Sequence, residues 1–475
     1  MMGAMDKGGL SRLRGVDPLR TAMMAKPRGR AVPAIGALLC AAFFALALRL
    51  LAAMSGAAAI AAIGTVCVGI LLVGAFGAMR DGGAPVAVYL CVGALAMLAV
   101  GAHLAMLDIK PGRYTKVLAP MLEEMWNYEL VTAMAWEDGA WSGGYLIVMA
   151  LISRLEAFSA LYAIKLFDLL CLSLCACAAG RLAALRGAKM PGQVGAQMAC
   201  MLAPTVLMNA GCWAQCDAMF AALTLWGLLL ALTEHPLSGC ALLGVALATK
   251  LQSAFVFPLL IVLFMDRKVS LRHLLALSAA ALLGQLAILL DGQGIESLIG
   301  RYDTQLATAR ETIGLTDNGA GVFGLMKVAS VREFSGLGLY IGIACALLVV
   351  LALLRAKRPL TGDALLLGAL LLAAGLPLVL PQVNARSLYL AGLLAFAAAG
   401  NARRMAAALI LELVSLCSYM NAIFSVEIMP IQALSMLAIA AAVLILLELL
   451  AALGIGQRGD GLRRSGESAS AEVKA

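Results

Sequence analysis

Long apolar stretches alternate with short polar connections along most of the chain. Stretches that reach or approach the length needed to cross the hydrocarbon core of a membrane lie at residues 34–56, 58–79, 84–106, 158–180, 193–210, 217–233, 238–252, 253–265, 273–290, 336–355, 363–380, 387–401, 405–424 and 431–453. The pattern predicts an all-α, polytopic integral membrane helix bundle of about 14 transmembrane segments. The stretches 238–252 and 253–265 are short and meet at Lys250, so a re-entrant pair is the alternative there.

Composition supports a membrane protein. Of the 475 residues, 63% are hydrophobic and 13% are charged, and the mean hydropathy is +0.96. A soluble domain carries about 45–50% apolar and about 25% charged residues, so the polar surface of a soluble globule is missing. The 12 cysteines fall mostly within apolar runs, as Cys171, Cys175 and Cys177 do, which excludes a disulfide scaffold.

The basic residues of the short connections indicate one orientation. They alternate with the apolar stretches at Arg80; Arg181, Arg186 and Lys189; Arg267, Lys268 and Arg272; Arg355, Lys357 and Arg358; Arg403 and Arg404; Arg458, Arg463 and Arg464. Because cytoplasmic loops are rich in Lys and Arg, we expect both termini inside, with a basic tail at 1–33 and a disordered tail at 454–475. The net charge of +8 is thus explained by topology, and we expect no nucleic-acid partner.

Two long connections, 107–157 and 291–335, remain on the predicted outer side, and a polar site is expected there. Residues 144–155 are apolar but too short to span, so we expect a helix lying in the outer interface. Trp126, Trp136, Trp141 and Tyr145 are the aromatic residues typical of headgroup level.

Polar groups at membrane depth are costly and are therefore candidates for function. The sharpest cluster is the hinge at 209–217, where Trp213, Gln215 and Asp217 together can bind sugar hydroxyls. The alternative is a hydrated turn in which Asp217 caps the next helix. The three histidines are scattered over different segments, so we expect no metal site and no cofactor.

Three further sets of polar residues are singled out. Lys250, with Gln252 beside it, can pair with a lipid phosphate or simply extend to the surface. The guanidinium of Arg386 can bind two phosphate oxygens at once, or Arg386 can serve as an ordinary surface residue. Lys165 and Asp168 are spaced i,i+3 on one helical face, which favours a neutralising structural pair.

The order of these features resembles the bacterial polytopic glycosyltransferases of the GT-C superfamily, in particular the mannosyltransferase and dolichyl-phosphate-sugar transferase relatives. The matching elements are Tyr114 with Leu118-Ala119-Pro120, Gly143-Gly144-Tyr145, Tyr-Ala-Ile-Lys-Leu at 162–166, Trp-Ala-Gln-Cys-Asp at 213–217, Lys-Leu-Gln at 250–252 with Pro258, and Asn384-Ala385-Arg386 with Tyr389. The resemblance covers roughly residues 84–400 and implies a GT-C-like domain at 84–453, preceded by two extra spans at 34–83.

The resemblance implies a function in the bacterial cytoplasmic membrane. The expected reaction moves a mannose-like hexose from a polyprenyl-phosphate-linked donor to a glycan, lipid or protein acceptor on the outer face, for the cell envelope. The residues expected to bind the donor phosphate are Lys250, Arg386 and Arg113. Those expected to bind sugar or acceptor are Trp213, Gln215, Asp217 and Gln252. Some relatives use a divalent metal, but the loss of acidic residues described next argues against one here.

The chain departs from the family pattern at its acidic positions. Gly-Asp-Tyr is replaced by Gly112-Arg113-Tyr114, Asp-Tyr-Asn-Pro-Pro-Tyr by Ala-Trp-Ser-Gly-Gly-Tyr at 140–145, and His-Glu-Arg by Asn384-Ala385-Arg386. Arginine cannot act as a general base near neutral pH. The base is then expected at another acid of the first outer loop, with Asp108 the first choice and Asp138 the second. The alternative is a protein that binds a polyprenyl-phosphate glycan, or partners an active transferase, without catalysis. A transporter is disfavoured because the chain shows no repeated halves.

Overall fold

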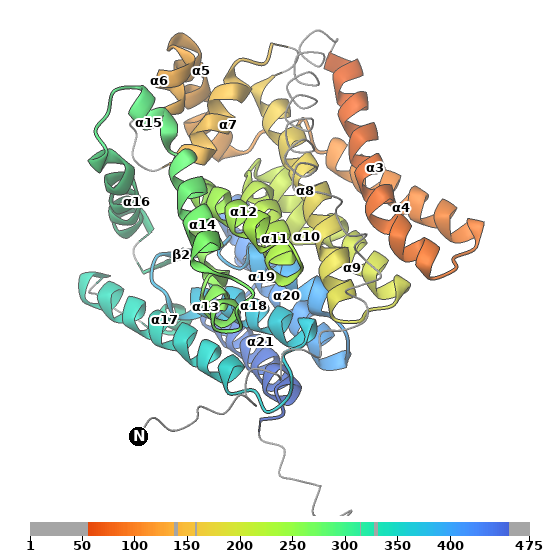
Figure 1. Ribbon diagram of the computed structural model, residues 1–475. Coiled ribbons are helices and arrows are strands. Elements are labelled where there is room, and N and C mark those ends of the chain that lie inside the picture. Colours follow the sequence, from red (N-terminus) through yellow and green to blue (C-terminus); the bar gives the residue numbers. More distant parts are fainter. Residues whose placement is uncertain (1–55, 137–140, 157–158, 314, 327–330, 456–475) are drawn as a thin grey trace, which may run out of the picture.

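The computed structural model describes residues 56–136, 141–156, 159–313, 315–326 and 331–455. Within these ranges the chain is helical apart from loops and one pair of two-residue strands (Figure 1). The all-α fold class is confirmed for the described part of the chain. The predicted tail at 1–33, most of the first predicted span and nearly all of the predicted tail at 454–475 lie outside the described residues.

Seven described helices are long and apolar enough to cross a membrane. They are α3 (Gly56–Asp81), α4 (Val86–Leu104), α8 (Ala160–Leu185), α17 (Val331–Leu354), α18 (Gly362–Val379), α20 (Ala402–Phe424) and α21 (Ile431–Ala452). Each coincides with a predicted apolar stretch. The coarse prediction, a helical protein with several helices of membrane-spanning length, is therefore confirmed.

The other predicted spans that fall within the described residues are shorter or broken in the structure. They correspond to α9 (Met190–Leu202), α10 (Pro204–Leu207) and η3 (Met208–Cys212), then α11 (Asp217–Leu232), α12 (Pro236–Thr249), η4 (Leu251–Val256), α13 (Pro258–Met265), α14 (Leu271–Leu283), α15 (Leu286–Leu290) and α19 (Tyr389–Ala398). At about 1.5 Å per residue, even the 16-residue helix α11 is shorter than a hydrocarbon core of about 30 Å. The count of 14 crossings and the orientation thus stay predictions.

Helices α8 and α18 occupy the middle of the bundle and bury most of their surface, whereas α3 and α4 pack at one edge (Figure 1). The small residues along α8, including Cys175, Ala176 and Gly180, let α9 and α11 approach it closely. Close packing around α8 and α18 gives the ends of neighbouring helices fixed positions, which matters for the site described below.

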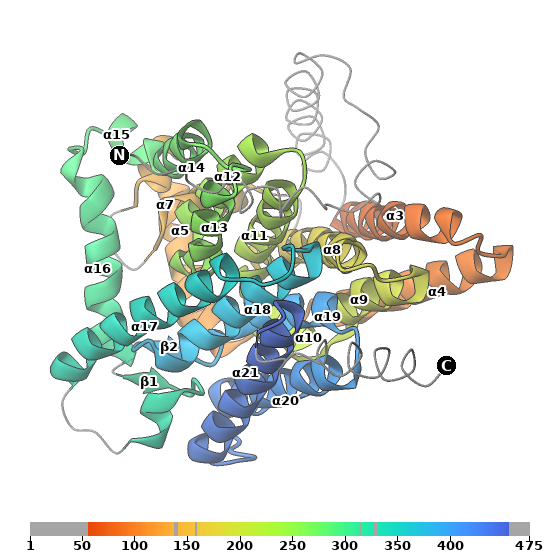
Figure 2. The ribbon, with the colours of Figure 1, turned by 60° about the horizontal axis from the view of Figure 1, so that its bottom comes forward.

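The two predicted outer loops are themselves folded. The first contains η2 (Tyr114–Leu118), α5 (Ala119–Asn127), α6 (Leu130–Met134) and α7 (Gly143–Ser153), and α7 confirms the short helix expected at 144–155. The second contains α16 (Glu296–Ile313), β1 (Thr316–Asp317) and η5 (Val322–Leu325). Strand β1 pairs in parallel with β2 (Val383–Asn384), beside α17 (Figure 2). This pairing joins the second loop to the segment that carries Arg386.

The predicted pair between Lys165 and Asp168 is wrong. The Lys165 ammonium donates instead to the backbone carbonyls of Met106, Leu107 and Ile109, at 2.6, 3.1 and 2.7 Å. Asp168 accepts a hydrogen bond of 3.3 Å from the backbone nitrogen of Ala218, in the first turn of α11. Lys165 thus binds the turn that follows α4 and Asp168 binds the first turn of α11, so each side chain satisfies backbone groups of another segment rather than the other side chain.

Candidate functional site

A cavity of about 440 Å³ lies where the first of the two predicted outer loops meets the ends of α11, α12 and α18. The first loop contributes Arg113, Trp141 and Tyr145. The helix ends and the segments next to them contribute Gln215, Asp217, Phe220, Lys250, Gln252, Asn384 and Arg386, while Phe255, Leu339 and Leu380 supply apolar lining. Six of the residues expected to bind phosphate or sugar therefore line one cavity, although they come from four distant parts of the sequence.

Asp217 is placed by a sharp turn before α11. The π-helical segment η3 ends at Cys212, and Ala214 adopts a left-handed backbone with φ of 52°. This turn puts Asp217 in the first turn of α11, where a carboxylate is favoured by the helix dipole. Its Oδ2 accepts a hydrogen bond of 3.0 Å from Asn209, and its side chain is 4% exposed. The capping role considered from the sequence is not realised, because Cys216 is the N-cap residue of α11 and makes no side-chain capping hydrogen bond; Asp217 lines the cavity instead.

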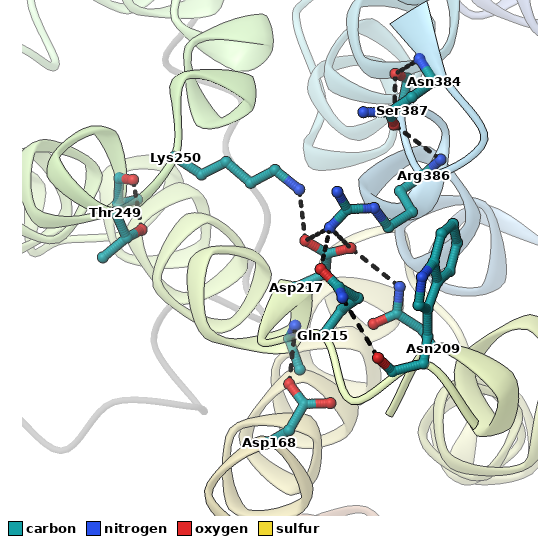
Figure 3. Close-up of polar contacts among 12 residues, drawn as sticks. Asp168, Asn209, Gln215, Asp217, Thr249, Lys250, Asn384, Arg386 and Ser387 are labelled. Atoms are coloured by element: carbon teal, nitrogen blue, oxygen red, sulfur yellow. Dashed lines mark hydrogen bonds and ion pairs between the residues drawn. The ribbon is translucent and has the colours of Figure 1, made fainter. Parts of the chain in front are cut away.

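Arg386 is positioned by a short turn after β2. The Asn384 side chain accepts a 3.0 Å hydrogen bond from the Arg386 backbone nitrogen, and Ser387 accepts one of 3.0 Å from the backbone of Asn384. The Arg386 guanidinium donates to Gln215 at 2.6 Å and lies 3.3 Å from Oδ2 of Asp217 (Figure 3). It also stacks over Trp213, 5.2 Å from the ring centroid.

Lys250 approaches the same carboxylate from the opposite side (Figure 3). Helix α12 ends at Thr249 and Lys250 is extended, with φ of −161° and ψ of 129°. Its ammonium donates to Oδ1 of Asp217 and lies 4.8 Å from the centroid of the Phe220 ring. The side chain of Lys250 is 25% exposed, against 4% for Asp217, so the cation lies nearer the open space of the cavity than the carboxylate does.

Arg113 supplies the third cation. Its guanidinium carbon lies 5.6 Å from the centroid of Trp141, and Trp141 stacks on Tyr145 with centroids 5.0 Å apart. The loss of water around Arg113 and the like charge of Arg386 lower the pKa of the Arg113 guanidinium, which nevertheless stays charged near neutral pH. The lowered pKa of Arg113 reflects chiefly the burial of its guanidinium and, in smaller part, the nearby charge of Arg386.

The charges of the cavity are unbalanced. Each of its three cations rests on an aromatic ring, and a ring attracts a cation without cancelling its charge. Among the described residues that line the cavity, Asp217 is the one carboxylate. Three positive charges therefore face a single negative charge, an arrangement that attracts an anion.

The expected catalytic acids do not join this group in the described structure. Asp108 is exposed, accepts a hydrogen bond from the Tyr162 hydroxyl, and lines a separate cavity with Lys110 and Glu123. It follows α4, as the sequence indicated, but it is not among the residues that line the cavity with Lys250 and Arg386. Asp138 lies outside the described residues.

Gln252 lines the cavity as expected of a residue that binds sugar or acceptor. Its Oε1 atom is buried and has no hydrogen-bond partner within the described part of the chain. A buried acceptor without a donor is costly, so a ligand hydroxyl at this point would satisfy it.

Sequence reasoning missed two aromatic residues that support the cations. Phe220 lies one helical turn after Asp217, so the i,i+3 spacing on α11 contained the signal. Tyr419 comes from α20: its hydroxyl accepts a 3.2 Å hydrogen bond from Asn209, and its ring contacts Trp213 edge to face, with centroids 5.2 Å apart. No spacing in the sequence connects residue 419 to the hinge at 209–217.

The described residues contain no group of three or more His, Cys, Asp or Glu side chains arranged to hold a metal ion. No protein-family model and no curated protein sequence matches the chain.

Proposed function

We propose that the protein is a GT-C-like membrane protein that binds the phosphate of a polyprenyl-phosphate-linked glycan in the cavity between Lys250, Arg386 and Arg113. The observation that carries this proposal is the meeting of three ring-supported cations with one carboxylate in a cavity that also has apolar lining. Guanidinium and ammonium groups are the usual partners of phosphate oxygens, and Phe255, Leu339 and Leu380 offer an apolar surface to a lipid chain.

The same cavity offers contacts to a sugar. Gln252 presents an unsatisfied acceptor, and Gln215 provides an amide beside Arg386. Amide groups of this kind orient hydroxyl-rich ligands through hydrogen bonds. These contacts would hold a sugar that is linked to the bound phosphate.

The geometry favours binding without transfer. A general base must lie within hydrogen-bond reach of the hydroxyl whose proton it accepts, and Asp108 lines another cavity. Asp217 is close enough, but Lys250, Arg386 and Asn209 already occupy its oxygens. A carboxylate held by two cations is a poor proton acceptor.

Sugar transfer is the second candidate, and the position of Asp217 supports it. If the donor phosphate takes over Lys250 and Arg386, the Asp217 carboxylate is released next to the bound sugar. Asp217 would then replace Asp108 and Asp138 as the base that accepts the proton of the acceptor hydroxyl.

Full-length protein in lipid nanodiscs, incubated with a radiolabelled polyprenyl-phosphate hexose, distinguishes these functions. Binding without transfer predicts retained label, lost in Arg386→Ala and kept in the control Arg403→Ala, whose side chain is 71% exposed on α20. Label passed to an added envelope acceptor, and abolished by Asp217→Asn, would establish the transferase. No retention of label by the unmodified protein overturns the proposal.

A further inference from the structure

The ion pairs inside the cavity are arranged so that the cations face the open space and the carboxylate lies behind them. The side chains of Lys250 and Arg386 are 25% and 13% exposed, and that of Asp217 is 4% exposed. A molecule that enters the cavity therefore meets the positive groups first.

Asp217 satisfies these cations only in part. An ammonium has three N–H donors, and Asp217 takes one from Lys250. The terminal nitrogen of Arg386 that faces Asp217 is shared with Gln215, which is neutral. Asp217 thus leaves N–H donors of Lys250, and part of the positive charge of Lys250 and Arg386, for a ligand to pair with.

The excess positive charge of the cavity can be counted from the residues that line it. Arg113, Lys250 and Arg386 face Asp217 alone among the described residues that line the cavity, an excess of two positive charges in the lining, while Asp317 acts on Arg113 from outside the lining. A phosphate monoester carries about −1.5 to −2 charge near pH 7, because its second pKa is about 6. A phosphodiester has only one ionisable oxygen and carries a single negative charge.

We propose that this cavity selects a dianionic lipid phosphate, a monoester or a diphosphate, over a singly charged phosphodiester, and that Asp217 sets this preference. The inference rests on the proposed function and specifies its ligand. Asp217 acts here as a positioning residue: it fixes Lys250 and Arg386 and cancels one of the three positive charges. The remaining excess of two matches the charge of a terminal phosphate.

A preference for a dianionic phosphate bears on the choice between sugar transfer and binding without transfer. The donor of a GT-C-like transfer is a phosphodiester, whereas the lipid left after the sugar has gone is a monoester. A cavity that prefers the dianion holds the free lipid phosphate, or a diphosphate-linked glycan, more tightly than a monophosphate-linked sugar donor.

The test compares two lipids that differ by one methyl group. Unmodified full-length protein in nanodiscs is titrated near pH 7 with a fluorescent polyprenyl monophosphate and with its methyl ester. We expect the monoester to bind at least about tenfold more tightly, because one additional charge is neutralised inside the cavity. Equal affinity for the two lipids overturns the inference and leaves the proposed function standing. Binding of neither overturns both.

Charge variants extend the test. Lys250→Met lowers the excess charge by one and is expected to reduce the ratio of the two affinities, whereas Asp217→Asn raises the excess and is expected to strengthen binding of both lipids. Asp81→Asn is the matched control, since Asp81 pairs with Arg80 on the surface and its side chain is 64% exposed. An unchanged affinity ratio in Lys250→Met, with the monoester still bound, contradicts the charge argument.

Discussion

A terminal nitrogen of Arg386 lies 3.3 Å from Oδ2 of Asp217, which ties the turn after α18 to the first residue of α11. The same guanidinium stacks over the ring of Trp213, which belongs to the turn that leads into α11. This turn therefore supplies both a ring that supports the arginine and a carboxylate that pairs with it.

Removing the ring beneath Arg386 should weaken anion binding without changing the charge of the cavity. Trp213→Leu loses a cation–π contact worth about 0.5–2 kcal/mol, and we expect a corresponding loss of affinity for a polyprenyl monophosphate, up to about thirtyfold. Trp213→Phe should retain part of the affinity. Trp226→Leu is the control, because Trp226 donates to the carbonyl of Leu174 outside the cavity. Equal affinities for Trp213→Leu and the unmodified protein would show that the ring has no such role.

Gly144 allows α7 to approach the end of α12. A Cβ at this position would lie 2.8 Å from the carbonyl oxygen of Ala248, a backbone atom that cannot move aside easily. We expect Gly144→Ala to destabilise the protein by about 1–3 kcal/mol and to lower the midpoint of thermal unfolding in detergent. Gly195→Ala, on α9 with open space around it, should leave the midpoint unchanged or raise it slightly. A midpoint for Gly144→Ala as high as that of the control contradicts this packing.

The turn before Asp217 strains the backbone at Ala214. Its φ of 52° is unfavourable for a residue with a Cβ, by roughly 1–2 kcal/mol, and glycine adopts it without this strain. Ala214→Gly should therefore raise the free energy of unfolding or leave it unchanged, despite the greater freedom of glycine in the unfolded chain. Ala222→Gly, inside α11, should lower it by about 1 kcal/mol. Chemical denaturation of the two variants compares them directly, and equal losses would argue against strain at Ala214.

Lys165 stabilises the turn that follows α4 through three carbonyl oxygens. Lys165→Met leaves those oxygens without their donor, and we expect a loss of about 1–3 kcal/mol in the free energy of unfolding. Lys165→Arg, which keeps the charge and donors, should recover part of it. Hydrogen exchange at 105–110 provides a local readout, since faster exchange there is expected only in the methionine variant. Unchanged exchange and stability would mean that water replaces the ammonium at no cost.

The helical class and most of the cavity could be predicted from the sequence because both depend on local chemistry. Asp217, Lys250 and Arg386 each interrupt an apolar pattern, and a charge at such a break must find a partner or reach water. That these three find one another follows from packing around α8 and α18, which no single stretch of sequence specifies.

The predictions that were wrong also depended on packing between distant segments. Asp108 follows α4 as expected, but its position depends on how η2 and α5 fold back, and the Tyr162 hydroxyl holds it in another cavity. Lys165 and Asp168 share a helical face, yet each bonds to backbone groups of another segment, Lys165 to the turn after α4 and Asp168 to the first turn of α11. Spacing along one helix is informative only where other helices present no competing groups.

The pairing of β1 with β2 has a consequence for the order of assembly. The helices α17 and α18 lie between the two strands in the sequence, so the strands can meet only after both helices have been synthesised. Closing so long a segment is slow compared with local helix formation. Arg386 comes after β2 in the chain, so a ribosome that stalls before residue 383 leaves a nascent chain that contains Asp217 and Lys250 but not the arginine that pairs with Asp217.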